Sequence, residues 1–67
     1  MNKFAERLKE LREEKSLSQR NLAKELGVSQ AAIARWENNL QIPNIEVAII
    51  VAKYFNISTD YLLGLED

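Results

Sequence analysis

The residues of this chain best suited to recognition chemistry lie between Ser29 and Asn38, in a segment with helical spacing. At about 100° per residue, Ile33 and Trp36 share one apolar face of that helix. The opposite face carries small and polar side chains, namely Gln30, Ala31, Ala34, Arg35 and Asn38. An arginine fork can bind guanine, a glutamine amide can bind adenine, and an alanine methyl can contact the methyl group of thymine. This face therefore offers groups that could read base edges in the major groove of DNA.

The helix over about 29–38 is predicted to follow another short helix, over about 18–26 with Ser18 as its cap, after a tight turn. Gly27 stands where a helix-ending residue with positive φ is needed, and Ser29 can cap the next helix by accepting a bond from a free backbone N–H. The side chains expected to be buried between the two helices are Leu22, Leu26, Val28, Ile33 and Trp36. This pattern predicts a helix-turn-helix over about residues 18–38.

The remainder of the chain carries the signals of three more helices and no strand pattern. A polar cap candidate precedes each helix: Asn2 before residues 3–15, Asn44 before a helix that ends near Phe55, and Ser58 before a helix through Leu63. In the loop before Asn44, Asn39 is expected to take a positive φ, and Leu40 and Ile42 are expected to anchor the loop onto the core. The predicted fold class is all-α, a compact five-helix bundle containing a helix-turn-helix, in one domain over residues 1–67.

The composition excludes several classes of site. The 67 residues include no cysteine and no histidine, which excludes disulfides and the usual zinc sites. No glycine-rich phosphate loop is present, and a chain of this length is not expected to form a large cleft. The sequence therefore predicts no enzyme, no metal, no cofactor and no small-molecule ligand. The longest apolar run, Val47–Ala52, is far shorter than the ~20 residues of a membrane span. The absence of cysteine is compatible with a cytoplasmic location, where thiols are kept reduced.

The net charge of −1 and the pI of about 5.4 weigh against nucleic-acid binding, because DNA attracts cationic proteins. The distribution of the charge softens this objection. Residues 1–35 hold eight Lys or Arg and five Glu, a net charge of +3, whereas residues 36–67 hold one Lys and five acids, a net charge of −4. The N-terminal half could face DNA and the C-terminal half solvent. Charge alone nevertheless favours an ordinary soluble surface.

The predicted helix between Asn44 and Phe55 is apolar nearly all round. One face is formed by Ile45, Ala48, Val51, Ala52 and Phe55. A second stripe, well away from the first, is formed by Val47, Ile50 and Tyr54. A helix of this kind is normally buried on more than one side, and an exposed apolar stripe commonly marks a contact with another chain. The second stripe is therefore predicted to form a homodimer interface, unless the fifth helix and the tail cover it.

Several segments in order resemble the phage-repressor/Cro-type helix-turn-helix family, also called the lambda-repressor-like or Xre family. They are FAERLKELRE, LSQRNLAKELGVSQAAIARWEN, PNI, VAKYFNIS and TDYLLG, which together extend over most of the chain from Phe4 to Gly64. The resemblance implies a bacterial or phage-encoded five-helix domain that binds double-stranded DNA with its third helix in the major groove.

The resemblance also implies roles for individual residues. The implied base-reading positions are Gln30, Ala31, Ala34 and Arg35. The implied contacts to the DNA backbone phosphates are Gln19, Ser29 and Asn38. The implied buried ion pair between the first and third helices is Arg12 and Glu37. Many family members carry Lys or Arg in the loop after the third helix, whereas NNLQIPN has neither, so the affinity of one domain for DNA is expected to be modest.

Two functions from different classes remain open. The first is a sequence-specific transcription regulator, a repressor that binds a palindromic operator as a homodimer with recognition helices about 34 Å apart. The second is a protein-interaction module of the same fold, antitoxin-like or a regulatory subunit, with little DNA affinity of its own. The acidic charge and the apolar fourth helix favour the second. The sequence leaves open whether the chain is a whole Cro-like protein or the N-terminal part of a longer repressor.

Overall fold

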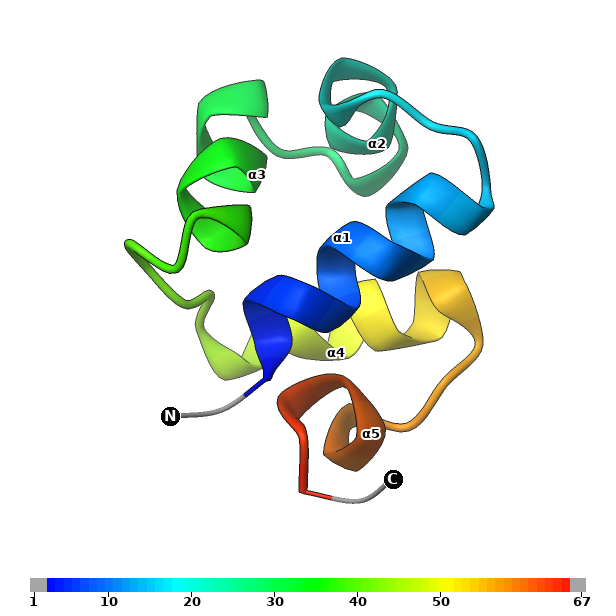
Figure 1. Ribbon diagram of the computed structural model, residues 1–67, viewed down its shortest axis with the longest axis vertical. Coiled ribbons are helices and arrows are strands. Elements are labelled where there is room, and N and C mark those ends of the chain that lie inside the picture. Colours follow the sequence, from blue (N-terminus) through cyan, green and yellow to red (C-terminus); the bar gives the residue numbers. More distant parts are fainter. Residues whose placement is uncertain (1–2, 66–67) are drawn as a thin grey trace.

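Five α-helices follow one another in the computed structural model, which describes residues 3–65 (Figure 1). They are α1 (Phe4–Glu14), α2 (Gln19–Leu26), α3 (Gln30–Glu37), α4 (Ile45–Phe55) and α5 (Thr59–Leu63). Residues 3–65 contain no strand, and the predicted all-α five-helix bundle is confirmed. The helix-turn-helix of α2 and α3 lies on one side of α1, and α4 and α5 lie on the other side. No helix in this part of the chain is long and apolar enough to cross a membrane.

Four of the five helices begin at a polar side chain that accepts a hydrogen bond from a backbone N–H three residues later. The caps are Ser18, Ser29, Asn44 and Ser58, and their hydrogen bonds are 2.9–3.1 Å long. Each bond satisfies one of the N–H groups that the first turn of a helix leaves without a partner. The caps that the sequence predicted at these four positions are confirmed.

The first helix begins differently from the prediction. It starts at Phe4 rather than Lys3, and Lys3 occupies the cap position without a side-chain hydrogen bond. Asn2, the predicted cap, lies outside the described residues. The backbone N–H of Lys3 instead donates to the carbonyl oxygen of Leu63 at 3.3 Å. The start of α1 is therefore held by the last residue of α5, a contact between positions too far apart in the sequence for a local capping signal to indicate.

Helix ends use residues in the left-handed conformation. Gly27 after α2 has φ 73°, and Gly64 after α5 has φ 81°. Asn39 and Asn56 take the same conformation after α3 and α4, with φ 60° and 57°. Glycine adopts this region without steric cost, and asparagine tolerates it better than most residues. The positive φ that the sequence predicted at Gly27 and Asn39 is confirmed.

Replacing Gly64 by alanine is expected to destabilise the fold more than replacing Gly27. Either substitution places a Cβ on a left-handed residue, which costs about 1–2 kcal/mol. At Gly64 the added Cβ would also lie 2.9 Å from the Cβ of Lys3, whereas at Gly27 it would meet no atom within 4 Å. Thermal denaturation of the two variants, followed by circular dichroism, measures the difference. Equal losses would show that the close approach of Lys3 carries no cost.

All five helices contribute to the core. Among residues 3–65, six side chains have no solvent exposure, namely Phe4, Leu8, Leu22, Ile33, Val51 and Leu62. Trp36 is nearly buried, and its ring lies edge-on to that of Phe4 with 6.1 Å between centroids, a favourable geometry for an aromatic pair. Since Ile33 and Trp36 turn into this core, the opposite side of α3 is left to the solvent.

Three apolar side chains predicted to be inside are exposed. Leu40 and Ile42 in the α3–α4 loop are 76% and 58% exposed, and Ile45 at the start of α4 is 78% exposed. The prediction was wrong for these residues because the loop and the first position of α4 lie beyond the edge of the core. The other residues of the predicted core face are buried, namely Ala48, Val51, Ala52 and Phe55.

The second apolar stripe of α4 is partly covered by the chain itself. Val47 and Tyr54 are half-buried and pack against the core. The hydroxyl of Tyr54 donates to Oε1 of Glu25 in α2 at 3.2 Å, and its ring lies edge-on to Phe55 at 5.0 Å. Only Ile50, which is 49% exposed, presents a large part of its surface to solvent. Tyr54 thus contacts α2.

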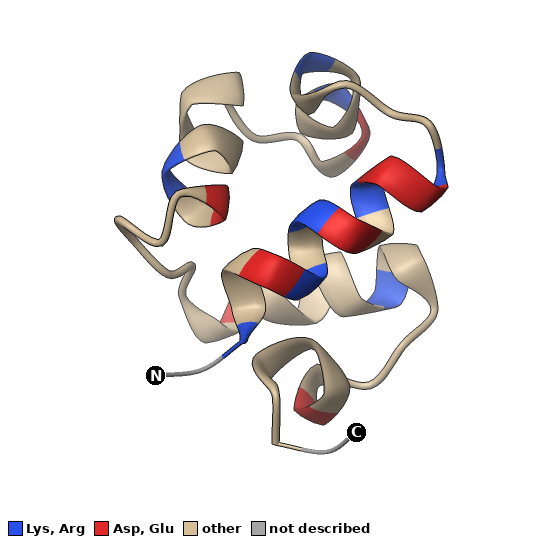
Figure 2. Ribbon diagram, viewed as in Figure 1, with Lys and Arg blue, Asp and Glu red and all other residues tan. Residues whose placement is uncertain are grey.

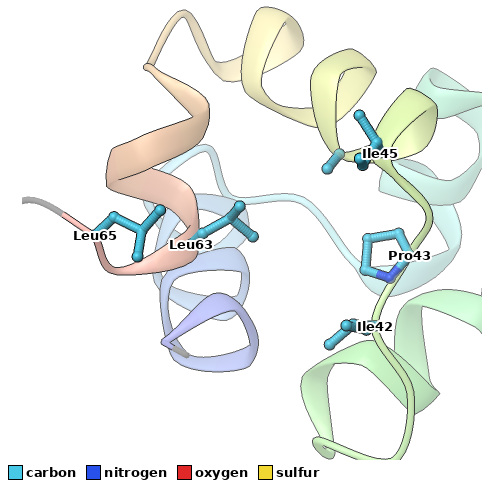
Figure 3. A pocket seen from close by; sticks show the side chains of 6 residues that line it. Ile42, Pro43, Ile45, Leu63 and Leu65 are labelled. Carbon is cyan, nitrogen blue, oxygen red and sulfur yellow. The ribbon is translucent and has the colours of Figure 1, made fainter. Parts of the chain in front are cut away.

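A separate apolar groove lies between the start of α4 and the end of α5 (Figure 3). Its volume is about 310 Å³, and it is lined by Ile42, Pro43, Ile45, Ala48, Leu63 and Leu65. Figure 3 shows Leu63 and Leu65 on one wall and Ile42, Pro43 and Ile45 on the other. None of the described residues that line the groove is charged. The exposed apolar surface of α4 is therefore divided between this groove and the neighbouring residues Ile49 and Ile50, which are 39% and 49% exposed.

Candidate nucleic-acid interface

The outer face of α3 collects the residues predicted to read bases. Helix α3 lies at the edge of the bundle, where its inner residues are held by the core (Figure 1). Gln30, Ala31 and Arg35 are exposed, and Ala34 is half-buried on the same side. Ser29 and Asn38 are exposed at the two ends of the helix. The structure therefore leaves an unobstructed face with two long polar side chains and two methyl groups.

A buried ion pair fixes the opposite edge of α3 to α1. The guanidinium of Arg12 donates to Glu37 through Nε at 2.7 Å and through Nη2 at 3.0 Å. The side chains are only 13% and 4% exposed. The hydrogen bond to Glu37 raises the pKa of Arg12, and burial acts in the opposite direction. The two parallel bonds set the orientation of the pair as well as its strength.

Two further bonds extend this pair into a network. Nη1 of Arg12 donates to the carbonyl oxygen of Leu17 at 2.8 Å, and Nε2 of Gln19 donates to Oε1 of Glu37 at 3.1 Å. The network links α1, the α1–α2 connection, the start of α2 and the end of α3. The resemblance implied a phosphate contact and the support of a base-reading side chain for Gln19, and the bond to Glu37 was not predicted. An amide nitrogen carries two N–H groups, so Gln19 has a second donor besides this one.

A side chain outside the helix-turn-helix contacts Arg35. Nε of Arg35 donates to Oε1 of Gln41 in the α3–α4 loop at 2.8 Å. No role was predicted for Gln41. The turn after α3 explains the contact, since the backbone N–H of Leu40 donates to the carbonyl of Arg35 at 2.9 Å and that of Asn39 to the carbonyl of Trp36 at 3.1 Å. This pair of bonds is a Schellman motif, which folds the chain back over the last turn of the helix.

The exposed charge of the helix-turn-helix is positive although the chain as a whole is acidic. Arg20 and Lys24 in α2 and Arg35 in α3 are all exposed. Figure 2 shows the blue of basic residues on both helices. Glu37 is paired with Arg12, whereas Glu25 is exposed and accepts a hydrogen bond from the neutral hydroxyl of Tyr54. Three exposed cations therefore stand against one exposed carboxylate. Arg20 and Lys24 were not among the predicted DNA contacts. Their exposure strengthens the view that the N-terminal half could face phosphates.

Residues 3–65 contain no group of three or more His, Cys, Asp or Glu side chains that could hold a metal ion. In the same part of the chain, every buried side-chain nitrogen or oxygen has a hydrogen-bond partner. A polar binding site in this part of the chain must therefore use exposed groups, and those on the outer face of α3 and at its ends are among them.

Comparison with known proteins gives relatives that regulate transcription. The chain is 41% identical over 64 residues to the HTH-type transcriptional activator BcrR of Enterococcus faecalis, a match over 96% of this chain and 31% of BcrR. It is 38% identical over 60 residues to Repressor protein C2 of Salmonella phage P22, a match over 90% of this chain and 28% of C2. The chain thus spans about a third or less of the length of these two relatives.

The fold comparison gives the same answer. The crystal structure of the P22 c2 repressor in complex with synthetic operator 9T matches with a TM-score of 0.87 and 35% identity, over 94% of this chain and 96% of that one. Residues 8–62 match the Helix-turn-helix family. The resemblance found in the sequence is thereby confirmed. The chain belongs to the helix-turn-helix family of the Cro/C1 type, a class of DNA-binding transcription regulators and not of enzymes.

Proposed function

We propose that residues 1–67 form one DNA-binding domain of a transcription repressor, which acts in the cytoplasm by inserting α3 into the major groove of an operator. The observation that carries this proposal is the exposed polar face of α3, held rigidly from behind by Ile33, Trp36 and the Arg12–Glu37 pair. A side chain can discriminate between bases only when its helix is fixed relative to the DNA. The P22 c2 repressor, whose fold this chain shares, was solved with a synthetic operator.

The proposed contacts follow from the chemistry of each exposed group. Arg35 binds guanine through its fork, Gln30 binds adenine through its amide, and the methyl groups of Ala31 and Ala34 contact thymine methyls. The phosphate contacts are assigned to three polar residues at the margins of this face, Gln19, Ser29 and Asn38. The oxygen of Ser29 already accepts a bond from the N–H of Ala32, so its hydroxyl proton is the group offered to a phosphate.

Two copies of the domain would read a palindromic operator. Recognition helices bound to successive major grooves are about 34 Å apart. The domain measures 28 × 23 × 20 Å, so two copies lying side by side can present their α3 helices at this separation. We assign the contact between the copies to the stripe of Val47, Ile50 and Tyr54, with Ile50 at its centre because the other two residues are half-buried.

Replacing Ile50 by glutamate is expected to weaken self-association by at least about tenfold, because a carboxylate would be buried between the two copies. Ile45→Glu is the matched control, since Ile45 is also an exposed isoleucine of α4 but lines the groove beside α5. Sedimentation velocity over a concentration series measures both variants. The opposite result, a dimer disrupted by Ile45→Glu and preserved by Ile50→Glu, would move the interface to the groove.

Selection from a pool of random duplex DNA at moderate salt tests the DNA-binding proposal. Enrichment of an inverted repeat, with half-sites about one helical turn apart, is the expected result. Its base pattern can then be compared with Gln30, Ala31 and Arg35. No enrichment by a protein shown to be folded would contradict the proposal.

A protein-interaction module is the second candidate, and the exposed apolar side chains favour it. Leu40, Ile42, Ile45 and Leu65 are all more than half exposed on a chain with a net charge of −1. Such surfaces commonly mark contacts with other proteins. Salt dependence separates the two candidates, because DNA affinity falls steeply as the salt concentration rises, whereas association through apolar surfaces does not weaken in this way.

A further inference from the structure

The loop that follows α3 is tied to the side chain at the centre of the proposed recognition face. The Schellman bonds made by Asn39 and Leu40 fix the path of the backbone at the end of the helix. This path returns Gln41 to within 2.8 Å of Nε of Arg35, six residues earlier in the chain. The loop thus presents one hydrogen-bond acceptor to the one arginine of α3.

The bond uses a specific part of the guanidinium. Arginine has five N–H donors, one on Nε and two on each terminal nitrogen. Gln41 accepts the Nε–H, which leaves both terminal nitrogens with their donors available to a ligand. A guanine edge offers two adjacent acceptors, O6 and N7, to such a pair of donors. Arg35 can therefore approach guanine end-on through its two terminal nitrogens, whereas a side-on approach would need the Nε–H that Gln41 accepts.

We infer that Gln41 is a positioning residue for base recognition: by accepting the Nε–H of Arg35, it holds the guanidinium so that only its terminal nitrogens meet the DNA, and so sharpens the preference for one G·C pair. This inference rests on the proposed function. A free arginine side chain is among those that lose most rotamer freedom on binding. The bond to Gln41 already restricts the Arg35 side chain in the free protein, so less rotamer freedom is lost when DNA binds. The same bond disfavours a side-on approach to the base through Nε.

A positioning role for Gln41 also accounts for the lack of charged residues in the α3–α4 loop. The segment from Asn39 to Asn44 carries no charged residue, so it brings no cation to the phosphates. An acidic residue at position 41 would pair with Arg35 more strongly but would also place a negative charge beside the DNA. The amide of Gln41 supplies an acceptor without that charge.

A double-mutant cycle tests the inference. The wild type, Gln41→Ala, Arg35→Ala and the double variant are measured for affinity to the selected operator and to the same operator with the G·C pair replaced. Gln41→Ala is expected to reduce the ratio of the two affinities by about threefold to tenfold, and to have no effect on this ratio when Arg35 is already absent. Equal effects of Gln41→Ala in both backgrounds would show that Gln41 acts on DNA directly and would overturn the inference.

A second measurement uses the free protein. The exchange of the Arg35 Nε–H with water, followed by NMR, is expected to accelerate in Gln41→Ala, while the melting temperature stays unchanged because Gln41 is exposed. The same exchange rate in both proteins would remove the basis of the inference. If the wild type enriched no sequence in the selection experiment, that result would instead contradict the proposed function. A selective wild type whose preference survives Gln41→Ala would be a failure of this inference alone.

Discussion

Arg12→Met is expected to lower the free energy of unfolding by about 3–5 kcal/mol, the cost of leaving a buried charge without its partner. The carboxylate of Glu37 is 4% exposed, and without Arg12 it keeps only the amide of Gln19 as a side-chain partner. The variant also removes the donor to the carbonyl of Leu17. A domain of 67 residues is stable by only about 3–10 kcal/mol, so a loss of this size unfolds much of the population.

Urea denaturation of four proteins measures this effect. They are the wild type, Arg12→Met, Glu37→Leu and the double variant. The double variant is expected to regain most of the lost stability, because no unpaired charge remains in the interior and two apolar side chains fill the space. A single Arg12→Met variant within about 1 kcal/mol of the wild type would mean that water reaches Glu37 and that the pair does not hold α3 to α1.

Arg35→Ala is expected to weaken binding to the selected operator by about 1–3 kcal/mol and to relax the preference at one base pair. The guanidinium is the only charged group on the outer face of α3 and is exposed before DNA binds. Its loss removes a two-point contact with guanine, which no remaining side chain on that face can replace. Competition binding against operators with each base pair changed in turn locates the affected position.

Arg35→Lys is the matched variant for this experiment. Lysine keeps the positive charge but has no planar fork, so the salt dependence of binding should stay close to that of the wild type while the base preference declines. If Arg35→Ala lost the same affinity on every sequence tested, Arg35 would be a phosphate contact and not a base-reading residue.

The helix boundaries were largely predictable because their causes are local. Ser18, Ser29, Asn44 and Ser58 each bond a backbone N–H three residues away, and such short-range bonds depend on little besides the residue types. Ser16 was not predictable in this way. It has φ 56° at the end of α1, a conformation that its residue type does not favour and that the turn before Ser18 imposes.

The candidate site was predictable where periodicity decides it and not where tertiary contacts do. The 3.6-residue period alone placed Gln30, Ala31 and Arg35 on one exposed face. The bond from Gln19 to Glu37 and that from Arg35 to Gln41 depend on how two separate segments approach each other. Ile45 was misplaced for a related reason, since periodicity assigns a face of α4 but does not show where along the helix the core ends.

The hydrogen bond between Lys3 and Leu63 brings the two ends of the described chain together at one point on the surface. The packing of the five helices therefore does not depend on the order in which they follow one another along the chain. A circularly permuted chain, with a short linker from residue 65 to residue 3 and new ends between Leu40 and Gln41, would keep the same five helices around the same core. In that chain Arg35 would lie near one terminus and Gln41 at the other, so the architecture could be retained while the covalent path between the two side chains is cut.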